Sequence, residues 1–236
     1  MSRALSICWK EWRVMLDTPL GYVVATAFLL ASGFFFGKNL FLVGQADMRG
    51  YFSVLPLLLL FFIPAMSMRM LADEQREGTF ELLATMPVRM FDIVIGKFAA
   101  VLLQILALLA LTLVYPLSLS LLGHVDGGQI AVSYLATCLL AATYVSVSLY
   151  ASSLSSHAIV SYVLGFGMLL GLFLLAQAAA TLPPAMQDWI GMLSPMQHYA
   201  NMLRGVIGLE DFVFLLALSA GFLSLTWFQL ERRRWR

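Results

Sequence analysis

Residues 127–187 read GGQIAVSYLATCLLAATYVSVSLYASSLSSHAIVSYVLGFGMLLGLFLLAQAAATLPPAMQ and contain no Asp, Glu, Lys or Arg. A helix that spans a bilayer needs about 20 mostly apolar residues, so this stretch is long enough to cross a membrane twice. A polar cluster of Ser152, Ser153, Ser155, Ser156 and His157 interrupts it. Such a cluster suits a tight turn, and the stretch therefore predicts two consecutive spans joined by that turn.

The composition of the whole chain agrees with this interpretation. Of its 236 residues, 61% are hydrophobic and 11% are charged, and the mean hydropathy is +0.88. Soluble domains carry about 25% charged residues, and at this length roughly a third of the surface of the unfolded chain stays exposed. The composition therefore excludes a soluble globular or a disordered protein, and the net charge of +1 gives no reason to expect nucleic-acid binding.

Four further runs without charge complete the pattern, at 18–37, 50–68, 98–125 and 212–230. Together the runs predict an all-α, polytopic integral membrane protein, with one transmembrane domain over residues 1–236 and a basic tail at 231–236. The six expected spans lie near 20–40, 51–70, 97–122, 130–153, 158–181 and 211–230.

The distribution of Lys and Arg predicts the orientation of these spans. An even number of spans leaves both termini on one side, and cytoplasmic segments carry the excess of positive charge. The side with the termini holds eleven of the 14 basic residues, which places both termini in the cytoplasm. The opposite side holds Lys38, Arg49 and Arg204.

An amphipathic helix is expected before the first span, over residues 1–17. Apolar side chains from Leu5 to Leu16, including Trp9, Trp12 and Met15, share one face at helical spacing. Apolar sequence continues well beyond Ala27, so we expect no cleaved signal peptide. The helix is expected to lie at the cytoplasmic interface, where it either anchors the first span or also contacts a cytoplasmic partner.

The cytoplasmic stretch 68–87 holds a large share of the charge of the chain. Thr79 is a plausible N-cap, Glu81 suits the first turn of a helix, and Pro87 would end it. Phe80 and Leu83 would form one apolar face of this short helix. That face either lies back on the ends of the spans or docks into another protein.

The external stretch 182–211 is amphiphilic. Pro183-Pro184 and Ser194-Pro195 would each open a short helix, with Ser194 as N-cap and Pro195 in the first helical position. Gly205 would help to close the second helix. The segment either dips into the outer leaflet as a lid or forms a plain pair of interfacial helices.

Several kinds of chemistry have no counterpart in the sequence. We find no P-loop and no metalloprotease or serine-hydrolase motif, and we expect no catalytic, cofactor-binding or metal site. His124, His157 and His198 are expected to be solvated loop residues, and Gln104 is expected to hydrogen-bond across helices. No ionisable residue is expected in the middle of a span, so an active transporter would need energy from another subunit.

Small residues recur at a spacing of four in two spans, which allows close approach of helices. They serve either contact between subunits or packing within the chain. The residues concerned include Gly33 and Gly37 in the first span and Ser161, Gly165, Gly167 and Gly171 in the fifth.

The segment 66–97 resembles the signature of ABC-2-type permeases. The resemblance rests on Met68-Arg69, 74–83 (EQREGTFELL), 86–88 (MPV) and Gly96-Lys97. Ser194-Pro195, His198 and 204–207 (RGVI) resemble the stretch before the last span of that family. Within the family the chain looks most similar to the gliding-motility-associated permease branch.

The resemblance implies a permease of the bacterial inner membrane. It would work with a dimer of ABC ATPase subunits that holds ATP and Mg, with a second permease copy or paralogue, and with membrane lipid around it. The branch also implies an auxiliary membrane protein with an extracytoplasmic domain.

The resemblance further assigns residues to four roles. ATPase coupling falls to Glu74, Glu77, Gly78, Thr79, Phe80, Glu81 and Leu83; a second cytoplasmic contact to Ser155, Ser156 and His157; the permease interface to the six small residues named above; and an external gate to Trp189, Pro195, His198, Tyr199 and Arg204.

The expected function is to couple ATP hydrolysis by the partner to export or to conformational work across the membrane. Pro56, Pro64 and Pro116 are natural bending points for such movement. An alternative is a scaffold that moves no cargo and transmits force to an extracytoplasmic partner. A stand-alone channel or secondary carrier is less favoured, because the spans have no ion relay.

Overall fold

A computed structural model describes residues 3–43, 48–77, 90–121, 126–179, 191–205 and 208–234. The regular elements of this part are helices, and it contains no strand. The helices are α1 (Arg3–Asp17), α2 (Pro19–Val43), α3 (Arg49–Ser67), α4 (Arg69–Arg76), α6 (Met90–Leu111), α7 (Val114–Ser120), α8 (Gly127–Leu154), α9 (Ala158–Ala179), α11 (Pro195–Met202) and α12 (Leu209–Arg234).

Six of the described segments are long and apolar enough to cross a membrane, which confirms the predicted fold class. They are α2, α3 with α4, α6 with α7, α8, α9 and α12. In the third span, α6 begins at Met90, earlier than the expected span start near residue 97. The added turns contain Asp92, in the first turn of the helix, where the helix dipole favours a carboxylate.

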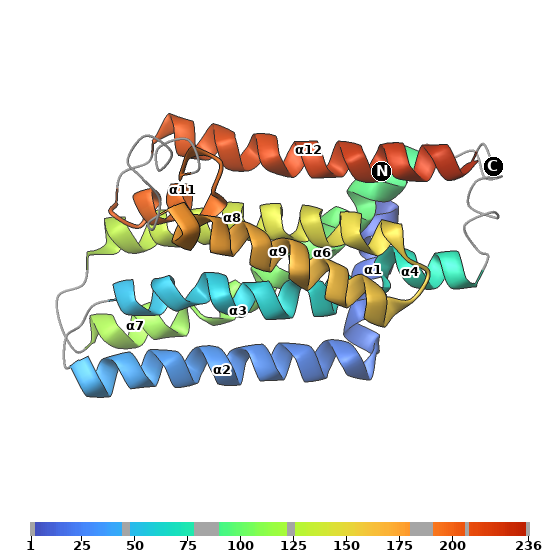
Figure 1. The fold of residues 1–236 in the computed structure, drawn as a ribbon. Helices are drawn as coiled ribbons and strands as arrows, with labels where there is room; N and C mark the ends of the chain where they lie inside the picture. Colours follow the sequence, from blue (N-terminus) through green and yellow to red (C-terminus); the bar gives the residue numbers. More distant parts are fainter. Residues whose placement is uncertain are drawn as a thin grey trace.

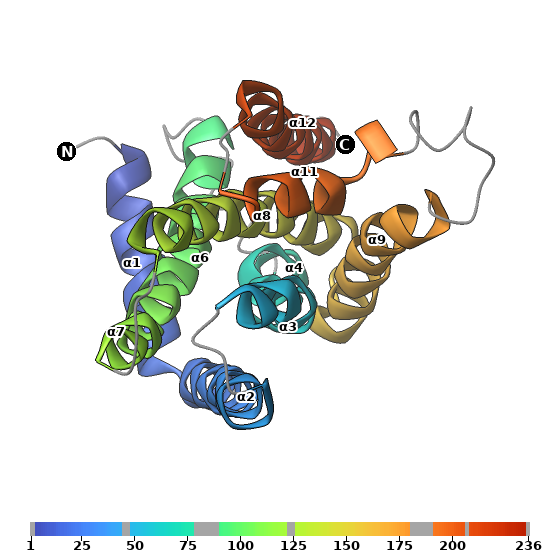
Figure 2. The same cartoon turned by 90° about the vertical axis from the view of Figure 1, so that its left-hand side faces the viewer.

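The long helices run side by side, and both termini lie toward the same end of the bundle (Figure 1). We call this the terminal end; it holds α1, α4 and the turn 155–157, and α11 lies at the opposite end. Seen along the bundle, α3 and α8 lie in the middle and the other spans surround them (Figure 2). Within the most apolar stretch of each span, 61% of residues are buried in α3 and in α8, against 11% in α2 and 17% in α9.

The third span is broken at Thr112 and Leu113, between α6 and α7. Pro116 has no N–H and its ring clashes with the carbonyl of the residue four positions earlier, which is Thr112. The helix therefore breaks where Pro116 predicts it. The Thr112 hydroxyl donates to the Leu109 carbonyl in the last turn of α6, at 2.7 Å.

The starts of α8 and α11 show two ways of beginning a helix. Asp126 caps α8 by accepting hydrogen bonds from the backbone of Gly128 and Gln129. Pro195 opens α11 as expected, but the Ser194 hydroxyl makes no capping bond, so only its N-cap position is confirmed. Gly205 follows α11 with φ +87°, a conformation that favours glycine.

The helix α1 crosses the bundle at the terminal end and packs on α6 (Figures 1 and 2). Gly96 permits the close approach, because a β-carbon there would lie 2.8 Å from the side chain of Ile7. The expected apolar face is only partly covered: Cys8 and Met15 are buried, whereas Leu5 and Trp9 are exposed.

Candidate docking surface at the terminal end

The junction between α3 and α4 is fastened to the end of α8 by one hydroxyl. Ser152 Oγ donates to the Met68 carbonyl at 3.0 Å and accepts from the backbone N–H groups of Leu71 and Ala72 at 3.2 and 3.3 Å. Gln75 adds a bond from Nε2 to the Ser153 carbonyl at 3.1 Å. Backbone groups freed where α3 ends are thus satisfied from α8, which holds α4 in a fixed direction.

A buried lysine joins α4 to α6 and α1. Lys97 is 2% exposed, and its Nζ lies 2.7 Å from Glu74 Oε1, 3.4 Å from Glu11 Oε1 and 2.7 Å from the Met70 carbonyl. An ammonium has three N–H donors, so these three acceptors match it. Buried charges persist in proteins when they are paired in this way. Sequence patterns did not indicate this cluster, because its members are far apart in the chain.

A second contact joins α1 and α6, further along α6 than Lys97. Trp12 Nε1 donates to Gln104 Oε1 at 2.9 Å. The expected hydrogen bond between Gln104 and another helix is confirmed: Gln104 accepts it, and the donor lies on α1.

A groove of about 760 Å³ lies between α4 and the start of α9. Glu77, predicted for ATPase coupling, and His157, from the predicted second contact, both line this groove. Ile159, on the wall of the same groove, is 77% exposed. The groove therefore combines charges of both signs with an uncovered apolar side chain, as docking surfaces do. Its other lining residues are Arg69, Asp73, Arg76, Ala158 and Val160.

The rest of the predicted contact residues divide into two groups. Ser155 and Ser156 lie in the turn beside the groove, and Ser155 Oγ accepts from the His157 backbone N–H at 3.1 Å. That bond gives the turn a defined shape. The remaining coupling residues lie outside the described part of the chain: Gly78, Thr79, Phe80, Glu81 and Leu83.

At the opposite end of the bundle, Tyr199 of α11 contacts α3 and α8. Its hydroxyl donates to the Phe52 carbonyl of α3 at 2.8 Å and lies 3.2 Å from Thr137 Oγ1 of α8. Tyr199 is fully buried, and Pro195 at the start of α11 is also buried. A predicted gate residue therefore contacts both central helices.

The prediction that His198 is a solvated loop residue is wrong. His198 lies within α11, its Nδ1 is 2.6 Å from Asp211 Oδ1, and its Nε2 donates to the Met192 carbonyl at 3.0 Å. Its ring stacks on Phe214 with centroids 4.1 Å apart. Packing between α11 and α12 leaves this side chain only 13% exposed, and no local pattern shows such a contact.

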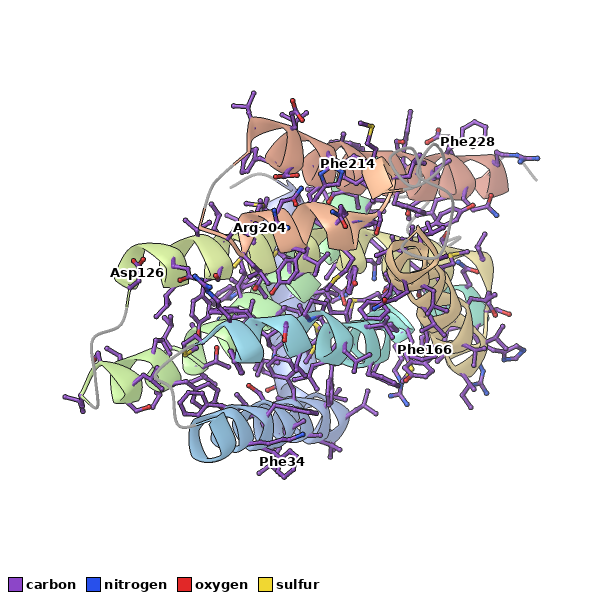
Figure 3. The ribbon with its side chains drawn as sticks, turned by 60° about the vertical axis from the view of Figure 1, so that its left-hand side comes forward. Phe34, Asp126, Phe166, Arg204, Phe214 and Phe228 are labelled. Atoms are coloured by element: carbon purple, nitrogen blue, oxygen red, sulfur yellow. The ribbon has the colours of Figure 1, made fainter. Side chains whose placement is uncertain are left out.

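The other gate residues have different surroundings. Arg204 is exposed at the end of α11, and Phe214 lies on α12 nearby (Figure 3). Trp189 lies outside the described part of the chain.

The small residues of the predicted permease interface fall into two sets. A β-carbon at Gly33 would lie 3.3 Å from the Tyr115 hydroxyl, and one at Gly165 would lie 3.5 Å from Ala151, so both face their own chain. Ser161 is buried as well. A β-carbon would meet no atom of the chain within 4 Å at the other positions: Gly37, Gly167 and Gly171.

The family model described as ABC-2 family transporter protein matches residues 42–228, which includes α3 to α11 and most of α12. No curated protein sequence matches the chain.

Proposed function

The chain belongs to the ABC-2 family of transporter proteins, and from this premise we propose that it is a permease subunit driven by an ATPase docked at the terminal end. The ATPase would supply the energy, with ATP and Mg bound in that partner. This chain would supply the membrane pathway and the surface that receives the movement.

The groove between α4 and α9 is the observation that carries the proposal. The resemblance assigns two separate segments to the ATPase contact, and Glu77 of one and His157 of the other line this same groove. A single rigid partner could therefore touch both. The predicted coupling residues 78–83 follow Glu77 directly in the sequence.

The contacts of α4 support a route for the movement. A partner that displaces α4 would pull on α3 through the Met68 junction, on α8 through Ser152 and on α6 through Lys97. The far end of α3 meets α11, where Tyr199 holds the Phe52 carbonyl. Movement at the groove would thus reach the proposed external gate through α3, one of the two most buried spans.

The remaining parts of the proposal concern the orientation in the membrane, the second permease copy and the branch of the family. The Lys and Arg excess at the terminal end supports cytoplasmic termini in a bacterial inner membrane. The open positions Gly167 and Gly171 support contact with a second permease copy. Membership of the gliding-motility-associated branch, with its auxiliary membrane protein, rests on the sequence resemblance.

Charge reversal in the groove tests the proposal. The tagged chain is purified from its native membranes and ATP hydrolysis is measured in the eluate, for the wild type and for Arg76→Glu/Glu77→Lys. Both side chains are exposed, so the double variant is expected to fold. We expect hydrolysis to co-purify with the wild type and to fall at least tenfold with the variant.

Glu210→Lys is the matched control, because Glu210 is also exposed but lies at the start of α12, at the opposite end of the bundle (Figure 1). It should retain the activity of the wild type. Full activity in the groove variant, or none with the wild type, would contradict the proposal.

A further inference from the structure

A second cavity lies at the elbow where α1 meets α2, and it shares Arg69, Asp73 and Glu77 with the groove beside α9. Its volume is about 240 Å³. One part of its wall is apolar and consists of Met15, Leu20, Val24 and Met66. Another part is polar and comes from α1, α4 and α6. The cavity is therefore amphiphilic, and it lies where the first span begins.

The polar wall has an excess of negative charge. Four carboxylates line it, from Glu11, Asp73, Glu74 and Glu77, against the two cations Arg69 and Lys97. All three N–H donors of Lys97 are engaged by Glu74, Glu11 and the Met70 carbonyl. Within the described residues, Asp73 has no ion-pair partner within 4 Å. The wall thus offers acceptors to a cation that brings its own N–H donors.

A buried amide donor also faces this cavity. Gln104 lines it and is 5% exposed. Because Trp12 can only donate, its bond to Oε1 fixes the orientation of the amide, with Nε2 as the donor group. The described part of the chain supplies no acceptor for this Nε2. Because Gln104 lines the cavity, this N–H group can donate to an oxygen of a ligand bound there.

The carboxylates, Arg69 and Gln104 lie at different distances from the terminal end. Gln104 lies two turns beyond Lys97 along α6, about 10 Å further from the terminal end at the rise of an α-helix. Arg69 is exposed and, within the described residues, makes no ion pair, so its guanidinium is available to an anion. Acidic groups and the cation of Arg69, which makes no ion pair within the described residues, therefore lie near the terminal end, and an amide donor lies deeper in the bundle.

We propose that this cavity binds the headgroup of phosphatidylethanolamine. The primary ammonium donates to Asp73 and the neighbouring carboxylates, the phosphate pairs with Arg69, and an ester carbonyl, which lies deeper than the headgroup in a bilayer, accepts from Gln104. The volume admits a headgroup and not a whole lipid, so the acyl chains lie outside. There Val14, Tyr22 and Val23 are exposed and apolar.

The chemistry of the wall selects among membrane lipids. A headgroup with net negative charge, as in phosphatidylglycerol, would meet four carboxylates. The quaternary ammonium of phosphatidylcholine has no N–H to donate to Asp73. The headgroup of phosphatidylethanolamine carries no net negative charge, and its primary ammonium has N–H groups to donate. The site should therefore distinguish these three lipids when their acyl chains are the same.

Lipid titration of the purified full chain tests the proposal without any ATPase. The delipidated chain in detergent is titrated with each of the three lipids, and the thermal unfolding midpoint and the bound lipid, by native mass spectrometry, are recorded. We expect phosphatidylethanolamine to give the only saturable stabilisation. Asp73→Asn should weaken its apparent affinity about tenfold, and Glu210→Gln, an exposed acid at the α11 end, should leave it unchanged.

Each outcome decides the proposal. Equal stabilisation by all three lipids, or equal affinity of wild type and Asp73→Asn for phosphatidylethanolamine, would overturn it. A full effect from soluble glycerophosphoethanolamine would overturn the assignment to a lipid. If Asp73→Asn does not fold, Glu77→Gln, at an exposed position on the same wall, is expected to weaken binding in the same direction, and unchanged binding would count against the site.

Discussion

Lys97 holds three elements together through one ammonium group. It is 2% exposed, and its partners come from α4 and α1. Removing one member of a buried ion pair leaves an uncompensated charge, which costs about 3–5 kcal/mol. Removal of this side chain should therefore cost more stability than removal of an exposed charge.

Lys97→Met tests that role. We expect the variant to lose about 3–5 kcal/mol of stability, because Glu74 and Glu11 lose their cation. A thermal melt of the purified chain in detergent measures the loss. Lys10→Met, at an exposed position on α1, is the control and should melt like the wild type.

A double variant separates the effect of losing the Lys97 charge from the effect of losing its side-chain packing. Lys97→Met/Glu74→Gln removes an uncompensated carboxylate together with the cation, so it should recover part of the stability lost in Lys97→Met. If Lys97→Met melts like the wild type, or if the second substitution recovers nothing, the ion pair does not hold this end together.

The Lys97 cluster also shows what sequence patterns leave out. Residues 11, 74 and 97 meet only because α1 folds back over α6, and no local periodicity reports such a contact. The same reason explains the error at His198, whose partner Asp211 lies on another helix. Single side chains could be assigned to spans and ends, but their partners depend on tertiary packing.

At the scale of elements, the crossing of α1 over α6 depends on Gly96. A β-carbon at this position would lie 2.8 Å from Ile7 and 3.0 Å from the Ala4 carbonyl. The Gly96 backbone therefore comes close to α1, and any side chain there must push α1 away.

Gly96→Val should destabilise the chain by about 1–3 kcal/mol, the usual cost of overpacking. The thermal midpoint of the purified chain in detergent measures the loss. Gly221→Val is the control, because a β-carbon at Gly221 meets nothing within 4 Å. Equal melting of the two variants would show that α1 does not pack closely on α6.

The spans themselves could be predicted well from charge alone. A stretch of about 20 apolar residues is a local property, and the gaps between charges locate it without tertiary information. The break before Pro116 follows equally from the chemistry of one residue. The start of α6 at Met90 could not be predicted in this way, because the charge of Lys97 is compensated from other helices.

At the scale of the whole molecule, α2 and α9 leave most of their surface outside the chain. Figure 3 shows Phe34 on α2 pointing away from the bundle, and its side chain is 68% exposed. Such surfaces require lipid or another protein as cover. The predicted permease interface would account for part of them, at Gly37, Gly167 and Gly171.

Cysteine crosslinking tests that interface. In a chain with Cys8 and Cys138 replaced by Ser, Gly167→Cys should give a disulfide-linked dimer on oxidation in membranes, because position 167 faces away from its own chain. Gly165→Cys is the matched control: it lies two residues earlier, packs against Ala151 and Pro64, and should stay monomeric. Dimers from both positions, or from neither, would contradict the predicted interface.

The most direct test of the central proposal asks which protein lies against the groove. Benzoylphenylalanine, a photoreactive residue, is placed at position 77 or 157 of the groove, or at position 128 at the opposite end, and native membranes are irradiated. We expect a covalent adduct between the chain and an ABC ATPase subunit from positions 77 and 157, and none from position 128. An ATPase adduct from position 128 alone, or from no position, would contradict the proposal.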